Sequence, residues 1–340
     1  MKKAIIGFAI LGVILMLLSG MSTSAEAKGN PHNNNNPPLN VTSPAEFDKV
    51  TELIIRWPVG WSAIEPIYIN MVSDSIDTVT VNIVVDNTMN EAYVKNVLSK
   101  NGITYNVTFT VAKTDTVWIR DYGPNFVIDS NGVEHIVDFK YFTGRKNDDK
   151  FPERYGVIYN VNVESVSLSY EGGNYMCDGN GIGFTTTMVY NENQGMTTDG
   201  VNDTIKTYFG LNQLVVLKPL KNEGTGHIDM FAKIVDYNTI IVGQYPESDE
   251  NYQVLEDDAA YLTALGYEVL RVPMLPGFKT YTNSLILNNK VLVPTYNTSG
   301  DENALRVYSN AMPGYEIIGI DCSNIIDYGG AIHCIAMTSP

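Results

Sequence analysis

Four short polar segments carry reactive or ionisable side chains. Each of these side chains lies beside a glycine or at the end of an apolar run. Three of the segments carry the ionisable residues Asp121, His227 with Asp229, and Cys334. A thiol becomes a nucleophile only as a thiolate, which requires a nearby base or cation. His227 could accept the thiol proton and later donate a proton to a leaving amine. The four segments are residues 118–124, 171–174, 224–229 and 329–334.

Asp121 and Asp229 could supply the second half of this chemistry. Two carboxylates can accept paired hydrogen bonds from the N–H donors of a guanidinium, which would hold its carbon facing the thiolate. A cysteine protease would use an acid to orient its histidine and would need an oxyanion hole instead. The combination of Cys334, His227 and two carboxylates therefore favours attack on a guanidinium carbon over attack on an amide. Trp118 could stack on the face of the cation or wall its pocket.

Each segment also has a structural interpretation when it is taken singly. Arg120 and Asp121 precede Gly-Pro and could form a turn with a local ion pair, and Glu171 before Gly-Gly-Asn could belong to another turn. His227 could be a structural residue of a glycine-rich loop, and Cys334 could be a small buried hydrophobe. The four segments together, rather than any one of them, therefore support the catalytic hypothesis.

The N-terminus has the pattern of a secretory signal peptide over residues 1–27. Lys2 and Lys3 precede an uncharged, largely apolar run over residues 4–18, and small residues follow up to Ala25-Glu26-Ala27. The run is too short for a comfortable membrane span, although an uncleaved anchor is the alternative. We therefore expect a secreted protein, extracellular or periplasmic, with no stable membrane association after cleavage.

Residues 28–42 are rich in Asn and Pro and almost free of apolar side chains, which predicts a disordered tether. A catalytic domain is expected over residues 43–340, and no Pro/Gly-rich linker divides it in two. The formal net charge of the chain is −16. A field of that sign repels nucleic acid and favours cationic ligands, although solubility outside the cell would explain it equally well.

The chain has three cysteines, Cys177, Cys322 and Cys334. A bridge between the first two would leave Cys334 as a free thiol, but the sequence does not establish that pairing. No Cys/His spacing indicates a zinc site, and no segment resembles an EF-hand calcium loop. We therefore expect neither a metal nor another cofactor.

Short β-branched runs alternate with helical patterns, which predicts an α/β fold. Residues 239–242 follow the strand-like run 230–235 across a short polar turn and predict a hairpin rather than a crossover. This mixture favours mixed α/β units over one doubly wound parallel sheet. Helices are expected over residues 91–100, 201–209, 250–265 and 301–312. Further strands are expected over residues 79–85, 104–111, 126–128, 136–139, 182–189, 214–217, 269–272, 284–287, 291–294 and 316–320.

Taken in order along the chain, the polar segments resemble the agmatine deiminase and bacterial-type peptidylarginine deiminase family of the guanidino-modifying, or pentein, superfamily. The resemblance covers nearly the whole mature chain. It implies a single-domain, five-bladed, pseudo-symmetric α/β propeller with the active site along its axis. It extends from Pro44-Ala45-Glu46-Phe47 and Arg56-Trp57-Pro58 to Gly329-Gly330-Ala331-Ile332-His333-Cys334.

The resemblance also implies a reaction, that of a hydrolase acting on C–N bonds of linear amidines. Cys334 would attack the guanidinium carbon, ammonia would leave, and water would hydrolyse the covalent amidino-thioether to a ureido product without a metal. His227 would be the general acid/base, and Asp121 and Asp229 would bind the guanidinium. Asn283 lies where family members carry an active-site asparagine, in a less distinctive stretch.

The resemblance adds a loop, residues 141–152, that looks like the loop with which bacterial peptidylarginine deiminases hold the carboxylate of a C-terminal arginine. Arg145 is the candidate for that contact, and a solvated charged loop is the alternative. Thr143 replaces a second arginine expected there, which puts strict C-terminal specificity in doubt. Glu171 lies in a family motif but could instead support its loop. The candidate substrate-binding residues are Trp118, Arg120, Arg145 and Glu171.

Export favours arginine-containing peptides over agmatine, because peptides are plentiful outside cells whereas agmatine breakdown belongs to cytoplasmic metabolism. We therefore expect a secreted deiminase that converts peptidyl- or protein-arginine to citrulline and ammonia. The alternatives are an agmatine deiminase that forms N-carbamoylputrescine, an amidinotransferase, and a non-catalytic binding protein with the same fold. The expected partners are arginine-containing peptides or small guanidines, and the sequence does not determine the oligomeric state.

Overall fold

A computed structural model describes residues 40–340 of the chain. The expected signal peptide over residues 1–27 and residues 28–39 of the expected tether lie outside the described residues. The last two residues of that tether instead form β1 (Val41–Thr42), which pairs antiparallel with β5 (Asn125–Asp129). The strand begins there because Val41 is buried in an apolar cluster with residues of the neighbouring sheet. Within residues 40–340, no helix has both the length and the apolar character needed for a membrane crossing.

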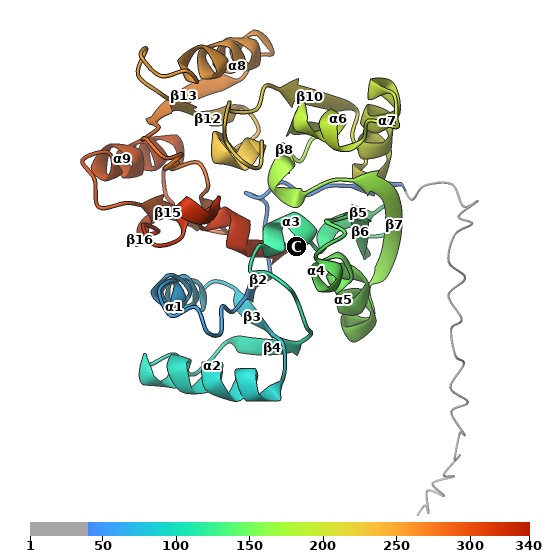
Figure 1. Ribbon diagram of the computed structural model, residues 1–340, viewed down its shortest axis with the longest axis vertical. Helices are drawn as coiled ribbons and strands as arrows, with labels where there is room; N and C mark the ends of the chain where they lie inside the picture. Colours follow the sequence, from blue (N-terminus) through green and yellow to red (C-terminus); the bar gives the residue numbers. More distant parts are fainter. Residues whose placement is uncertain (1–39) are drawn as a thin grey trace, which may run out of the picture. The chain divides into compact units, whose positions relative to one another are not determined.

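The described strands form five separate sheets, which lie around a common centre in Figure 1. The two four-stranded sheets are β1-β5-β6-β7, with β6 (Glu134–Lys140) and β7 (Asn162–Ser169), and β17-β2-β3-β4, with β17 (Ala336–Ser339), β2 (Glu52–Arg56), β3 (Thr80–Val85) and β4 (Val107–Val111). The three-stranded sheets are β10-β9-β8, with β10 (Gln213–Leu217), β9 (Ile182–Thr186) and β8 (Met176–Cys177); β11-β12-β13, with β11 (Ala232–Ile234), β12 (Thr239–Gln244) and β13 (Glu268–Pro273); and β14-β15-β16, with β14 (Leu285–Leu287), β15 (Lys290–Thr295) and β16 (Glu316–Asp321).

The same unit recurs in all five sheets. Two neighbouring strands run antiparallel, and a helical connection then returns the chain to a strand parallel to the second one. This recurrence confirms the expected mixture of hairpins and crossovers, and the hairpin expected within residues 230–242 is β11–β12. The connecting helices are α1 (Glu65–Ser75), α2 (Thr88–Lys100), α4 (Lys146–Asp149), α5 (Phe151–Tyr159), α6 (Met188–Glu192), α7 (Thr198–Phe209), α8 (Tyr252–Ala264) and α9 (Asp301–Ala311).

One sheet combines strands from both ends of the described chain. β17 pairs antiparallel with β2, and β2 pairs parallel with β3. Leu53, Ile54 and Ile55 of β2 are fully buried, as expected for a strand covered on both faces. Because Cys334 precedes β17 by two residues, this pairing carries the thiol back to the centre of the fold. There, α3 (Ile119–Tyr122) contacts both β17 and the short helix η4 (His333–Ile335).

Some local expectations were wrong. The expected strand over residues 182–189 ends at Thr186, and the chain continues into helix α6. Helices α1 and α5 were not expected, although each has a proline in its first turn, where the fixed φ of proline suits a helix start. The bridge between Cys177 and Cys322, which the sequence left open, is not formed: all three cysteines in the described chain are free and buried.

Candidate active site

Four short helical turns bring the polar segments of the sequence together. They are α3, η1 (Gly172–Asn174), η2 (Ile228–Met230) and η4. α3 contacts η1 and η4, and η1 contacts η2. Residues that are far apart in the chain therefore line one site, which lies near the centre of Figure 1.

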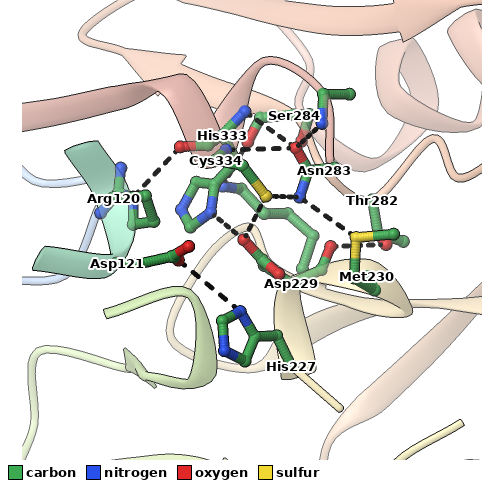
Figure 2. A network of polar contacts seen from close by, with 12 residues as sticks. Arg120, Asp121, His227, Asp229, Met230, Thr282, Asn283, Ser284, His333 and Cys334 are labelled. Carbon is green, nitrogen blue, oxygen red and sulfur yellow. Dashed lines mark hydrogen bonds and ion pairs between the residues drawn. The ribbon is translucent and has the colours of Figure 1, made fainter. Parts of the chain in front are cut away.

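The thiol of Cys334 lies between an amide and a carboxylate (Figure 2), with only 3% of the residue exposed. Asn283 Nδ2 donates to Cys334 Sγ at 3.1 Å, and Sγ donates to Asp229 Oδ2 at 3.4 Å. Asn283 Oδ1 also accepts the backbone N–H groups of Ala331, His333 and Cys334 at 3.0 to 3.3 Å. Asn283 therefore fixes the loop that carries the thiol, and it also orients the sulfur atom of Cys334.

His227 lies between two further carboxylates. Its Nε2 is 3.1 Å from Glu171 Oε2, and its Nδ1 is 3.6 Å from Asp121 Oδ1. Although burial opposes the charge, Asp121 and Glu171 raise the pKa of His227 from 6.5 to about 10. At neutral pH the imidazole is therefore protonated, and the free protein holds a proton donor at this position.

Two glycines allow the turn after Glu171 to pack this closely. A Cβ added to Gly172 would lie 2.1 Å from the backbone oxygen of Arg120. A Cβ added to Gly173 would lie 2.5 Å from His227 Nδ1. Both distances are far shorter than a van der Waals contact, so only glycine lets this turn approach the histidine.

Two buried carboxylate oxygens of the site, Asp121 Oδ1 and Asp229 Oδ1, lack a hydrogen-bond partner among residues 40–340. The same is true of three buried nitrogens, His227 Nδ1, Arg120 Nη2 and Asn174 Nδ2. A buried acceptor without a donor is unfavourable. A planar cation with several N–H donors would satisfy both carboxylates at once. In Figure 2, Asp121, Asp229 and His227 converge beside the Cys334 thiol, so a guanidinium held there would lie next to the sulfur.

The surroundings keep the thiol protonated in the free protein. Burial raises the pKa of Cys334 well above 9.0, and the charges of Asp229 and Asp121 raise it further. The carboxyl of Asp229 responds differently: although burial opposes ionisation, its hydrogen bond to His333 lowers its pKa. A cation bound between the two carboxylates would offset their charges and favour the thiolate.

Trp118 and Arg120 occupy different positions relative to the thiol. Trp118 is half-buried beside it: a Cβ added to Gly330 would lie 3.0 Å from the indole ring and 2.6 Å from Cys334 Sγ. Arg120 is buried, and its Nε donates to the backbone oxygen of His333 at 3.3 Å. Trp118 can therefore wall a pocket at the thiol, whereas the guanidinium of Arg120 contacts the protein's own groups.

Arg145 is partly exposed in the loop before α4. Its Nη1 donates to the hydroxyl of Tyr141 at 2.6 Å, and its guanidinium lies 5.2 Å from the centre of the Phe142 ring. Burial raises the pKa of Tyr141, and the charges of Asp121 and Glu171 raise it further. Arg145 therefore donates a hydrogen bond to Tyr141, and the pKa of Tyr141 responds to the charges of two residues of the site.

Asp121, Glu171 and His227 also offer the geometry of a metal-ligand set. Each presents one ligand atom, and these atoms lie within 4.8 Å of one another. A histidine must be deprotonated to bind a metal, and the raised pKa of His227 opposes this. The cluster therefore suits a cation that donates hydrogen bonds better than a metal ion.

Three residues that received no role from the sequence also lie at the site: Glu46, Lys233 and His333. His333 Nδ1 is 2.8 Å from Asp229 Oδ2, and His333 Nε2 is 2.8 Å from Glu46 Oε2. Glu46 in turn contacts Lys233 of β11. A lysine inside an apolar, strand-forming run was the signal that could have pointed to this cluster, because a buried lysine needs a carboxylate partner.

The chain is similar to known deiminases in sequence and in fold. The family model of the Porphyromonas-type peptidyl-arginine deiminases matches residues 42–340. The agmatine deiminase of Pseudomonas aeruginosa (strain LESB58) is 23% identical, over 69% of this chain and 77% of its own. The solved structure of C. jejuni agmatine deiminase matches with a TM-score of 0.79 at 24% identity, over 88% of this chain and 96% of that one. For Enterococcus faecalis agmatine deiminase the TM-score is 0.77 at 20% identity, over the same shares of the two chains.

Proposed function

Because the chain belongs to the Porphyromonas-type peptidyl-arginine deiminase family, and is thereby a hydrolase acting on C–N bonds of linear amidines, we propose that it deiminates agmatine to N-carbamoylputrescine and ammonia. One observation carries the proposal above all. Asp121 and Asp229 present buried oxygens that lack partners within the described chain, next to the only thiol that contacts a carboxylate and an amide there. This arrangement suits a substrate that brings a positive charge, several N–H donors and an electrophilic carbon.

In the first step of the proposed mechanism, the guanidinium binds between Asp121 and Asp229. Its charge offsets the two carboxylates, which removes two of the causes that raise the pKa of Cys334. The thiol can then release its proton to solvent as the substrate binds, and the hydrogen bond from Asn283 stabilises the thiolate. Substrate binding and activation of the nucleophile are therefore coupled through charge.

In the second step, the thiolate of Cys334 attacks the guanidinium carbon and forms a C–S bond. His227 donates its proton to one amino group, the C–N bond breaks, and ammonia leaves. The product of this step is an amidino-thioether on Cys334. The protonated state of His227 in the free protein supports this role, because the leaving amine needs a proton donor.

In the third step, water attacks the same carbon, and the now neutral His227 accepts a proton from the water. The C–S bond breaks, the second proton of the water passes to the sulfur, and the ureido product leaves, which restores the thiol of the free protein. Glu171 and Asp121 then favour the protonated form of His227 for the next cycle.

Agmatine is favoured as the substrate by the relatives, which are agmatine deiminases. Peptidyl-arginine is the second candidate, and the position of Arg145 favours it. A partly exposed guanidinium near the site could bind the carboxylate of a C-terminal arginine, a group that agmatine lacks. The export signal expected over residues 1–27 also belongs to the proposal and rests on the sequence pattern alone.

The five recurring units support a finer proposal about the architecture. Each sheet follows the same order of antiparallel and parallel pairing, as the blades of a pseudo-symmetric propeller would. A site built from the turns between such units would lie on the propeller axis.

Product identification with a panel of guanidines tests the proposed function. The panel contains agmatine, free arginine, and peptides with an internal or a C-terminal arginine, and both ammonia and the ureido product are measured. We expect kcat/KM for agmatine to exceed the others by about tenfold or more, and Cys334→Ala to abolish turnover. A preference for C-terminal arginine that Arg145→Ala removes would establish the second candidate instead. Absence of ammonia from every guanidine would refute both.

A further inference from the structure

His333 is held by carboxylates at both nitrogens of its ring. Nδ1 lies 2.8 Å from Asp229 Oδ2, and Nε2 lies 2.8 Å from Glu46 Oε2. The residue is only 1% exposed. An ionised carboxylate only accepts hydrogen bonds, so both ring nitrogens must donate, and the imidazole carries a positive charge. Figure 2 shows the Asp229 end of this chain of contacts beside the Cys334 thiol.

We propose that Glu46 and His333 are positioning residues for catalysis: Glu46 holds His333 as an imidazolium, and His333 keeps Asp229 ionised and oriented for the cationic substrate. This inference rests on the proposed function, because it requires Asp229 to bind a guanidinium. Glu46 and His333 act through Asp229, whose Oδ2 is shared between His333 Nδ1 and Cys334 Sγ.

The burial of Asp229 explains why its ionised form needs such support. The residue is completely buried, and its Oδ1 has no partner within residues 40–340. Burial by itself would favour the neutral acid, which has no charge to offer a guanidinium. The hydrogen bond and the charge of His333 outweigh burial and lower the pKa of Asp229, so the carboxylate stays ionised before the substrate arrives.

Glu46 is itself fixed from three elements of the fold. Lys233 of β11 contacts its carboxylate, Arg120 Nη2 of α3 lies 3.8 Å from Oε2, and the backbone N–H of Ile286 donates to Oε1 at 2.8 Å. Although burial opposes ionisation, Lys233 and His333 lower the pKa of Glu46 far below its usual value. The charge that holds His333 is therefore permanent under ordinary conditions.

The charges next to His333 also support the imidazolium. Glu46 and Asp229, its two partners, are carboxyl groups whose pKa values are lowered, and a neutral ring between them would leave buried negative charge without this partner, which is unfavourable. Asp121 behaves differently, because burial and the charge of Glu171 raise its pKa well above 3.8.

The variant Glu46→Gln tests the inference, because an amide keeps the shape of the side chain and removes its charge. The amide can donate as well as accept a hydrogen bond, so His333 Nε2 no longer has to donate to this side chain. His333 then stabilises the ionised form of Asp229 less, and the pKa of Asp229 rises. The acidic limb of kcat/KM for agmatine should move up by about one pH unit, with KM up to about tenfold higher at pH values below this limb and kcat within about twofold of wild type near pH 9. An acidic limb at the wild-type position would overturn the inference.

A double variant separates this role from support of the fold. Glu46→Gln leaves the ammonium of Lys233 buried without its carboxylate, which lowers stability whatever His333 does. The double variant Glu46→Gln/Lys233→Met removes both charges, so it should recover the wild-type Tm and keep the shifted acidic limb. If it regained the wild-type pH profile, Glu46 would only support the fold, and the inference would fail.

Binding to Cys334→Ala distinguishes failure of this inference from failure of the proposed function. Agmatine binding, measured by calorimetry from the lowest pH at which both proteins stay folded up to about pH 9, should weaken at the acidic end, and Glu46→Gln should move that dependence up by about one unit. A wild-type protein that releases no ammonia from any guanidine would refute the proposed function. An active wild type, with the same pH dependence of Kd in both Cys334→Ala proteins, would refute only the positioning role.

Discussion

His227 and His333 are both buried histidines between two carboxylates, yet their contacts differ in a way that separates two tasks. Both nitrogens of His333 have a carboxylate oxygen at 2.8 Å. His227 has one close partner, Glu171 at 3.1 Å, and its other nitrogen stands 3.6 Å from Asp121 with no hydrogen bond among the described residues. A histidine with both donors occupied can hold its neighbours in place, whereas one with a free nitrogen can exchange a proton with a substrate.

The same substitution made at both histidines tests whether their tasks differ. His227→Asn should lower kcat for agmatine by about a thousandfold at every pH, because both chemical steps need its proton. His333→Asn leaves the nucleophile and the acid in place and should act mainly on KM at low pH. Steady-state kinetics from acidic to basic pH decide this, and similar profiles for the two variants would show that the histidines do not differ in task.

The carboxylates beside the two rings should shift opposite limbs of the pH profile. The raised pKa of His227 depends on Asp121 and Glu171, so Glu171→Gln lowers it, and the histidine loses its proton at a lower pH. The basic limb of kcat should therefore move down by about one unit, with activity near pH 9 reduced about twofold and activity near pH 11 reduced about tenfold. Glu46→Gln should move the acidic limb up instead. A common direction of shift for the two variants would contradict the comparison.

Close packing around His227 gives a smaller effect, on stability. A Cβ at Gly173 would lie 2.5 Å from His227 Nδ1 and 2.7 Å from Asp121 Oδ1, so Gly173→Ala should lower the free energy of unfolding by about 1–3 kcal/mol. Gly195→Ala is the matched control, because a Cβ there meets nothing within 4 Å. Urea denaturation of both variants checks the expectation, which fails if they are equally stable.

The smallest effect is expected where an ion pair lies in solvent rather than beside a buried histidine. Lys150 Nζ is 3.1 Å from Glu153 Oε2, and both side chains are 60% exposed. Lys150→Gln should change the free energy of unfolding by less than about 0.5 kcal/mol and leave both limbs of the pH profile in place. A shift of either limb would mean that charges outside the cluster also set its protonation, which the same denaturation and kinetic series would reveal.

Much of the local structure was predictable from the sequence. The hairpin of β11 and β12 followed from a short polar turn between apolar runs, and helices α2, α7, α8 and α9 lie close to their expected positions. The proline-started helices α1 and α5 were missed. The pairing of β17 with β2 was not predictable locally, because it joins strands about 280 residues apart, and only the packing of the whole chain selects that partner.

The candidate site divides in the same way. Cys334, Asp121, His227 and Asp229 could be singled out because they lie in short segments with distinctive neighbours, and all four lie together in the structure. Arg120 was expected to bind substrate, but its guanidinium is engaged by protein groups instead. Its position depends on η4 and on Glu46, which no local pattern connects to it.

The amino-acid sequence specifies which reactive side chains the protein has, since the chemistry of a thiol, an imidazole or a carboxylate belongs to the residue. The task of each side chain depends on the packing of the folded chain. Glu46 and His333 lie 287 positions apart and meet at 2.8 Å. Against the effect of burial, the contact with His333 lowers the pKa of Asp229, whereas Asp121 and Glu171 raise the pKa of His227 to about 10. Protonation follows from the charges that surround a group and from its removal from water, and both arise only when distant segments are packed against one another.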